Sequence, residues 1–196
     1  MAQLEIWFPA KPFVVTQPFG VNGDFYKAHG INVAGHTGQD IRAFHGEKVR
    51  ATHNGIVTHA GVDGNEGWGV VIRTKIPYDY NGKETYFKTI YWHLMQNIPV
   101  KAGQEVKVGD VIGYADNTGF SFGDHLHFGL KPIERGETEW IWANSEQGNG
   151  YYGAIDPEPY WNGYFAEDAT VVLMNLSKQV ELLLKVVEML KKLIWK

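Results

Sequence analysis

Short runs of β-branched and aromatic residues, separated by Gly, Pro and Asn, dominate the first 160 residues of the chain. The segments GWGVVIRT, TYFKTIYWHL, QEVKVGDVIGYA and HLHFGLKP each have the length and composition of a strand. VRATHNGIVTHAG has the pattern of a β-hairpin, with two strands joined by an Asn-Gly turn. Helical periodicity is scarce in this region. The pattern therefore predicts a mainly β, antiparallel domain over residues 1–165.

Residues 166–196 follow a different pattern. Glycine does not occur after Gly163, and proline does not occur after Pro159. Apolar residues recur here at alternating spacings of three and four, the heptad pattern of an amphipathic helix. They are Leu173, Leu176, Val180, Leu183, Val187, Leu190 and Ile194. We predict a C-terminal amphipathic α-helix in residues 166–196, as a unit separate from the β domain.

The two parts also differ in charge. From Ala169 onward the chain has five lysines and two glutamates, a net charge of +3, whereas the remainder has 13 basic and 20 acidic residues, a net charge of −7. A basic helix with a broad apolar face can pack on its own domain, self-associate as a coiled coil or bundle, or lie on an anionic membrane. We expect self-association or docking, and keep membrane contact as the alternative.

Composition excludes several classes of function. The net charge of −4 gives no general electrostatic basis for nucleic-acid binding. The absence of cysteine excludes disulfides, thiolate zinc sites and cysteine nucleophiles. The N-terminus lacks the basic start and the apolar run of a secretory signal, so no signal peptide is predicted.

Two histidines stand one residue apart in the segment GDHLHFGL. Because a strand alternates its faces, His125 and His127 should point to the same side. A chain with eight histidines produces such a pair by chance with appreciable frequency. From this motif alone, two packed imidazoles and a metal site both remain open.

A second motif, AGHTGQDIRA, places His36 and Asp40 four residues apart, on one face of an extended segment. Gly35 and Gly38 allow another backbone to approach closely. The two motifs together offer nitrogen and oxygen ligands without thiolates, which favours an open catalytic zinc site over a closed structural one. Calcium would require more carboxylates and carbonyls. A further histidine, His93 in YWHLMQ, by itself fits a buried, hydrogen-bonded side chain.

The motifs GHTGQD, YWHL and GDHLHFGL, in this order, resemble the lysostaphin/LytM-type zinc metallopeptidases, the murein endopeptidases of cell-wall turnover, bacteriocins and phage lysins. The flanking segments VTQPFGVN, GEKVRATHNGIVTHAG and AIDPEPYW agree, so the resemblance covers residues 8–161. It implies a lysostaphin-like antiparallel fold, one Zn²⁺ ion and peptidoglycan as substrate. Phe122 and Asp124 stand where relatives often have Thr and Pro, which alters the loop before HLH without removing a ligand.

Carried over residue by residue, the resemblance implies that His36, Asp40 and His127 bind the zinc ion. It implies that His93 and His125 are the catalytic pair. Since the chain has no HExxH glutamate, a histidine would accept the proton of the zinc-bound water that attacks the scissile amide. Which of the two histidines is the base stays open.

Long glycine-bearing loops carry several aromatic residues that can wall a substrate groove, as in similar enzymes, or pack at the edge of the core. We predict a substrate groove formed by Tyr78, Tyr80, Trp140, Tyr151 and Tyr152. The histidines outside the motifs are predicted to be surface or turn residues. They are His29, His45, His53 and His59.

These observations predict a zinc-dependent endopeptidase that cuts peptide cross-links of peptidoglycan, as in a phage lysin or another cell-wall lytic enzyme. Without a signal peptide it would reach the wall, extracellular or periplasmic, after phage release or lysis, or on a virion. A non-catalytic wall-binding relative would be expected to lack ligands, whereas here the three ligands and the two catalytic histidines are all present. A carrier-type barrel, suggested by VKAGQEVKVGDVIGY, would need a modifiable lysine in a hairpin, which no segment matches.

Overall fold

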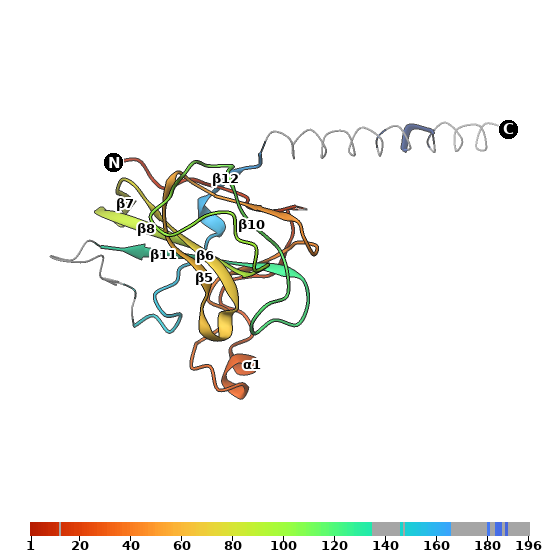
Figure 1. Ribbon diagram of the computed structural model, residues 1–196, viewed down its shortest axis with the longest axis horizontal. Coiled ribbons are helices and arrows are strands. Elements are labelled where there is room, and N and C mark those ends of the chain that lie inside the picture. Colours follow the sequence, from red (N-terminus) through yellow and green to blue (C-terminus); the bar gives the residue numbers. More distant parts are fainter. Residues whose placement is uncertain are drawn as a thin grey trace. The chain divides into compact units, whose positions relative to one another are not determined.

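The computed structural model describes residues 1–11, 13–134, 146, 148–165, 180, 183–185 and 187 (Figure 1). The chain divides into two units, Met1–Gly163 and Tyr164–Lys196, and each is described by itself. In the second unit, residues 180, 183–185 and 187 are helical, and the rest of the predicted heptad lies outside the described residues. Among the described residues, no helix has the length and apolar character needed to cross a membrane.

An eight-stranded sheet organises the first unit. Its order is β2-β3-β11-β8-β6-β5-β9, and β7 pairs with β8 off this path. The strands are β2 Val15–Gln17, β3 Gln39–Arg42, β5 Gly55–Val62, β6 Trp68–Thr74, β7 Tyr78–Tyr80, β8 Lys83–Leu94, β9 Glu105–Val106 and β11 His125–Ile133. Every pairing in this sheet is antiparallel. The predicted mainly β, antiparallel fold is confirmed.

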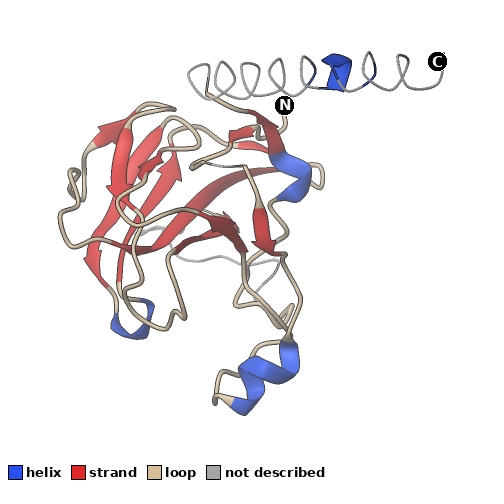
Figure 2. Ribbon diagram, turned by 90° about the vertical axis from the view of Figure 1, so that its right-hand side faces the viewer, coloured by secondary structure: helices blue, strands red, loops and turns tan. Residues whose placement is uncertain are grey.

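Smaller elements surround the sheet. They are the parallel pair β1 (Ile6–Trp7) and β12 (Trp161–Gly163), the antiparallel pair β4 (Lys48–Arg50) and β10 (Val111–Tyr114), the helix α1 (Gly23–Ala28), and the 3₁₀ turns η1 (Gly64–Glu66) and η2 (Glu158–Tyr160). Figure 2 shows α1 set apart from the strands, at one end of the first unit. The sequence analysis did not predict α1, a helix of only six residues, none of them buried, which is too short to show helical periodicity.

Alternation along the strands gives the sheet two different faces. Phe87 and Tyr91 of β8 and Leu126, Phe128 and Leu130 of β11 are fully buried in the core on one face. The residues between them on β11 point to the opposite face. We call this opposite side the open face, and a small apolar cluster lies on it. That cluster consists of Val71, Ile90 and Trp92.

The hairpin predicted for VRATHNGIVTHAG is wrong. β4 pairs with β10, and β5 pairs with β6 and β9. A two-residue type I′ turn needs a positive φ at both central residues, and neither Asn54 nor Gly55 has one. Instead Thr52 is buried, and its backbone N–H donates to the Tyr91 hydroxyl at 3.0 Å. This hydrogen bond to β8 fixes the segment where the chain passes from the two-stranded sheet of β4 and β10 to the eight-stranded sheet.

His53, in the same segment, is buried, although a surface or turn position was predicted. Its Nε2 lies 2.9 Å from Thr89 Oγ1 and its Nδ1 lies 3.0 Å from the carbonyl oxygen of Asn54. Burial lowers the pKa of His53 from 6.5 to about 4, and the hydrogen bond to Asn54 opposes this shift. The neutral ring is therefore the form that the folded protein holds.

We expect His53 to make the fold less stable in mild acid. Between pH 6.5 and 4 the unfolded chain protonates this ring and the folded chain does not, so the free energy of unfolding falls as pH falls, by about 3 kcal/mol in total. Denaturant unfolding of the wild type from pH 7 to pH 4 should show this slope, and His53→Gln should make it shallower by the contribution of this ring, because His93 and His127 also have lowered pKa values. The exposed-site control His45→Gln should keep the wild-type slope. Equal slopes in wild type and His53→Gln would contradict the prediction.

Candidate metal centre and catalytic site

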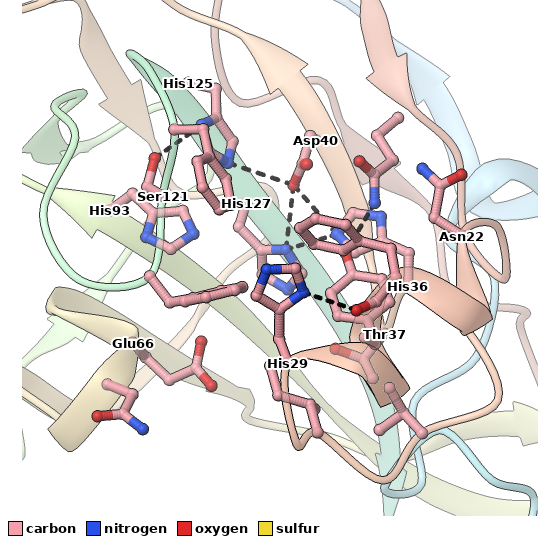
Figure 3. Close-up of a pocket in the computed structure, with 18 of the residues that line it drawn as sticks. Asn22, His29, His36, Thr37, Asp40, Glu66, His93, Ser121, His125 and His127 are labelled. Atoms are coloured by element: carbon pink, nitrogen blue, oxygen red, sulfur yellow. Dashed lines mark hydrogen bonds and ion pairs between the residues drawn. The ribbon is translucent and has the colours of Figure 1, made fainter.

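The two predicted ligand motifs meet on neighbouring strands. Asp40 of β3 is paired directly with His127 of β11, so both side chains project from the open face. His36, just before β3, completes the group. Its Nε2 lies 3.1 Å from Asp40 Oδ1 and 2.9 Å from His127 Nδ1, and His127 Nδ1 lies 3.1 Å from the same Oδ1 (Figure 3). Three donor atoms from two distant parts of the chain therefore converge.

Glycines allow this convergence, as the sequence predicted. A Cβ at Gly38 would lie 2.3 Å from the carbonyl oxygen of Phe128 on β11. A Cβ at Gly35 would lie 2.2 Å from the carbonyl oxygen of Gly20. Both distances are far below van der Waals contact, so any side chain at these positions would push the segment that carries His36 away from its neighbours.

The donor set fits a zinc ion. In a tetrahedral site with ligands about 2.0–2.1 Å from zinc, neighbouring ligand atoms lie about 3.3 Å apart. The three atoms of His36, Asp40 and His127 have nearly this spacing and would leave one position open. His36 Nδ1 lies 3.2 Å from the carbonyl oxygen of Pro18, so Nδ1–H donates to that oxygen and Nε2 is the atom that faces the site.

His93 and His125 stand beside this group. Their ring centroids are 4.7 Å apart, and His125 Nε2 lies 3.5 Å from Asp40 Oδ1. Each Nδ1 is 2.7 Å from a backbone carbonyl oxygen, that of Thr118 for His93 and that of Gly123 for His125. Because a carbonyl only accepts, Nδ1 carries the hydrogen in both rings, and in the His125 ring Nε2 faces the Asp40 carboxylate.

The position of His93 depends on an irregularity in β8. His93 has φ 64°, a left-handed conformation that is uncommon outside glycine. The β6–β8 register shifts at this point, with one extra residue on β8. In a regular strand Trp92 and His93 would point to opposite faces. Here Trp92 belongs to the cluster on the open face, and the His93 ring also lies there, beside His125.

The electrostatics of the group favour a cation. Burial by itself would raise the pKa of Asp40, but hydrogen bonds with His125, His127 and His36 outweigh it and hold that pKa far below its usual range. Burial lowers the pKa of His127. Burial, with the neighbouring histidines, lowers the pKa of His93 to about 4. Burial by itself would lower the pKa of His125, but the hydrogen bond and the charge of Asp40 outweigh it and raise that pKa. An ionised Asp40 beside a neutral His127 is the protonation state in which these two ligands bind a metal.

A cleft of about 890 Å³ opens above these residues (Figure 3). One wall is aromatic and consists of Phe25 of α1 with Phe120 and Phe122 of the loop before β11, all of them exposed. Ring centroids in this wall are 5.4–6.4 Å apart. His29, predicted as a surface or turn residue, also lines the cleft, with its ring 4.2 Å from that of Phe25. The sequence analysis missed this wall, although GFSFGD carries two of its residues.

The aromatic residues that were predicted for the groove are dispersed. Tyr152 lines the cleft and is 57% exposed, whereas Tyr151 packs against a neighbouring phenylalanine. Tyr78 and Tyr80 lie on β7 and pack against the core. Trp140 lies outside the described residues. Contact of these five residues with substrate stays a prediction.

The sequence model of Peptidase family M23 matches residues 34–139, more than half of the chain. The chain belongs to this family. The resemblance to lysostaphin/LytM-type enzymes is thereby confirmed. M23 peptidases are zinc metallopeptidases, and the matched region contains His36, Asp40, His93, His125 and His127.

Two curated relatives are similar to part of the chain. The DD-carboxypeptidase/endopeptidase Mpg of Neisseria meningitidis serogroup B is 37% identical over 126 residues, which is 62% of this chain and 26% of the relative. The L-Ala–D-Glu endopeptidase of Bacillus subtilis is 33% identical over 112 residues, 54% of this chain and 32% of the relative. The chain thus spans about a quarter to a third of the length of these relatives.

A solved structure has a similar fold. The crystal structure of a zinc containing peptidase from Vibrio cholerae is similar with a TM-score of 0.53 and 28% sequence identity. The similarity covers 66% of this chain and 37% of that chain.

Proposed function

We propose that this M23 chain is a zinc-dependent endopeptidase that hydrolyses peptide cross-links of bacterial peptidoglycan, within a phage lysin or another cell-wall lytic enzyme. The observation that carries the proposal is the convergence of two imidazole nitrogens and one carboxylate oxygen within 3.1 Å of one another, at the base of an open cleft. Relatives named as a DD-carboxypeptidase/endopeptidase and an L-Ala–D-Glu endopeptidase support a peptide substrate of this class.

The five polar residues divide into two roles. His36, Asp40 and His127 would hold the zinc ion. When bound, zinc would polarise a scissile carbonyl and lower the pKa of a bound water to about 7. His93 and His125 lie beside this group, each with its Nδ1–H bound to a backbone carbonyl, and His125 Nε2 lies 3.5 Å from Asp40 Oδ1.

Each of these two rings can therefore move a proton at one defined atom. An unprotonated Nε2 can accept the proton of the attacking water, and a protonated Nε2 can donate to the leaving amine or to the oxygen on which negative charge develops. The carbonyl oxygens of Thr118 and Gly123 keep both rings in the required tautomer and orientation. The aromatic wall of the cleft shields the reacting bond from water on one side.

Digestion of purified sacculi tests the proposal. Sacculi of several cross-link chemotypes are incubated with zinc-loaded protein, and the released fragments are identified by mass spectrometry. We expect new peptide amino ends from at least one chemotype, a rate more than about 100-fold lower after the metal is stripped with a chelator, and recovery when zinc is restored. Full activity of the stripped protein, or no release from any sacculus, would overturn the proposal.

The site of action follows from the substrate. An enzyme of this specificity acts on the cell wall, in an extracellular or periplasmic position, after phage release or lysis, or from a virion. For residues 166–196, self-association, docking and contact with an anionic membrane stay predictions.

A further inference from the structure

The cleft above the metal centre has an anionic lining. Three carboxylates line it, those of Asp40, Glu66 and Asp124, and among the described residues that line it there is no lysine or arginine. The zinc ion would neutralise Asp40. Glu66, at the end of η1, has no part in the metal centre, and Figure 3 shows it at the edge of the cleft. Its charge is therefore left for another group.

The backbone of Glu66 is fixed by the loop before β11. Phe120 N–H donates to the carbonyl oxygen of Asn65 at 2.6 Å, and a Cβ at Gly119 would lie 2.4 Å from the carbonyl carbon of Glu66. Within η1, the Glu66 N–H donates to the carbonyl oxygen of Asp63 at 2.9 Å. The Glu66 side chain therefore starts from a defined point at the edge of the cleft, next to Phe120.

The charge of Glu66 acts on residues of α1 and of β11. Burial, with the charges of Asp40 and Glu66, raises the pKa of Tyr26 to about 12. Burial lowers the pKa values of His127 and Lys131, and the charge of Glu66 opposes the shift in both. No hydrogen bond or ion pair joins the Glu66 carboxylate to another residue of the described part of the chain. The carboxylate is therefore close to the cleft and available to a ligand.

Phe120 adds an aromatic ring to this position. It is 36% exposed, and its ring centroid lies 5.4 Å from that of Phe122 and 6.4 Å from that of Phe25 in the aromatic wall. The face of an aromatic ring carries partial negative charge and attracts cations. A carboxylate supplies a full negative charge and accepts charge-assisted hydrogen bonds. The pair of Glu66 and Phe120 therefore suits an ammonium group and would repel a carboxylate.

We propose that Glu66 binds an ammonium group of the peptide substrate against the ring of Phe120. This inference rests on the proposed endopeptidase function and adds a determinant of specificity to it. The carboxylate accepts hydrogen bonds from the ammonium group, and the ring covers one side of it. Either the side-chain amine of a diamino residue or a free amino end of the peptide supplies the group.

Substrates modified at one amine test this site. Stem peptides from the cleaved chemotype are compared with the side-chain amine or the amino end left free, acetylated or dimethylated. Acetylation removes the positive charge, whereas dimethylation keeps it and adds similar bulk. We expect zinc-loaded wild type to prefer the free and dimethylated forms over the acetylated form at one of the two amines, by about tenfold or more in kcat/KM and chiefly through KM. The amine at which acetylation acts identifies the source of the ammonium group.

Variants assign the preference to Glu66 and Phe120. Glu66→Gln keeps the shape and removes the charge, so it should lose the preference, and Phe120→Leu should reduce it about threefold. Glu84→Gln is the matched control, because Glu84 is an exposed glutamate of β8 outside the cleft. Thermal unfolding of each variant establishes that it is folded. A wild-type preference in Glu66→Gln would overturn the proposal, and one in Phe120→Leu would overturn the contribution of the ring.

A binding measurement separates this inference from the proposed function. Titration calorimetry of the same peptides into zinc-loaded His125→Ala reports affinity without turnover. Tighter binding of the free and dimethylated forms, lost when Glu66→Gln is added, supports the ammonium site even if the wild type cleaves none of the peptides, a result that would contradict only the endopeptidase assignment. Equal binding and equal cleavage of all three forms would overturn the ammonium site and leave that assignment standing.

Discussion

A His127→Ala variant should lose its zinc, whereas a His125→Ala variant should keep the zinc and lose hydrolysis. His127 Nδ1 is one of the three converging donor atoms, so its removal leaves only His36 and Asp40 for the ion. His125 Nε2 lies 3.5 Å from Asp40 Oδ1, beside the group and outside it. The loss of a general acid or base predicts a fall of about 10²–10⁴-fold in the rate.

Metal content and rate must be measured on the same preparations. Elemental analysis after dialysis should give near-stoichiometric zinc for wild type and His125→Ala, and less than about a tenth of that for His127→Ala. His45→Ala, a change at an exposed histidine, should match wild type in both measurements. If His125→Ala also lost its zinc, the division between ligands and catalytic residues would be refuted.

Gly38→Ala should weaken zinc binding although it alters no ligand. The added Cβ would lie 2.3 Å from the Phe128 carbonyl oxygen and 3.0 Å from His127 Cε1. The segment that carries Gly38 must therefore move away from strand β11, and His36 and Asp40 move away from His127 with it. We expect at least about tenfold lower zinc affinity, as for other changes that disturb ligand orientation, and a loss of about 1–3 kcal/mol of stability from overpacking.

Gly148→Ala is the matched control for this variant. A Cβ there would meet no heavy atom of the described residues within 4 Å, and the φ of Gly148 lies outside the left-handed region. Competition with a chromophoric chelator gives zinc affinity, and denaturant unfolding gives stability. Wild-type affinity in Gly38→Ala would show that the close approach of the two segments does not position the ligands.

Local periodicity predicted much of the sheet, and the reason is physical. Side chains alternate along a strand irrespective of the rest of the fold, so the common face of His125 and His127 could be predicted from their spacing alone. The pairing of Asp40 with His127 joins residues 87 positions apart, and no local pattern contains it. The resemblance to a family supplied that information.

The wrong and the missed predictions also trace to contacts between residues far apart in the sequence. The Asn-Gly signal at residues 54–55 is local, and a buried hydrogen bond between Thr52 and Tyr91 overrides it. The left-handed conformation of His93 comes from a bulge between two strands, which a single strand's sequence does not show. Groove aromatics were predicted from loop composition, which does not say which loops border the site. The wall at Phe120 and Phe122 was missed for that reason.

The loop before β11 has two roles, one carried by its side chains and the other by its backbone. Its side chains at Phe120 and Phe122 form part of the aromatic wall of the cleft, while its backbone oxygens at Thr118 and Gly123 accept hydrogen bonds from His93 and His125. Every residue type has the same backbone carbonyl. The side chains at positions 120 and 122 can therefore be replaced without changing the hydrogen bonds that orient His93 and His125. Insertions or deletions in the loop would displace both. Divergence in substrate preference should therefore proceed here by replacement at constant loop length, which makes positions 120 and 122 suitable for a library of variants.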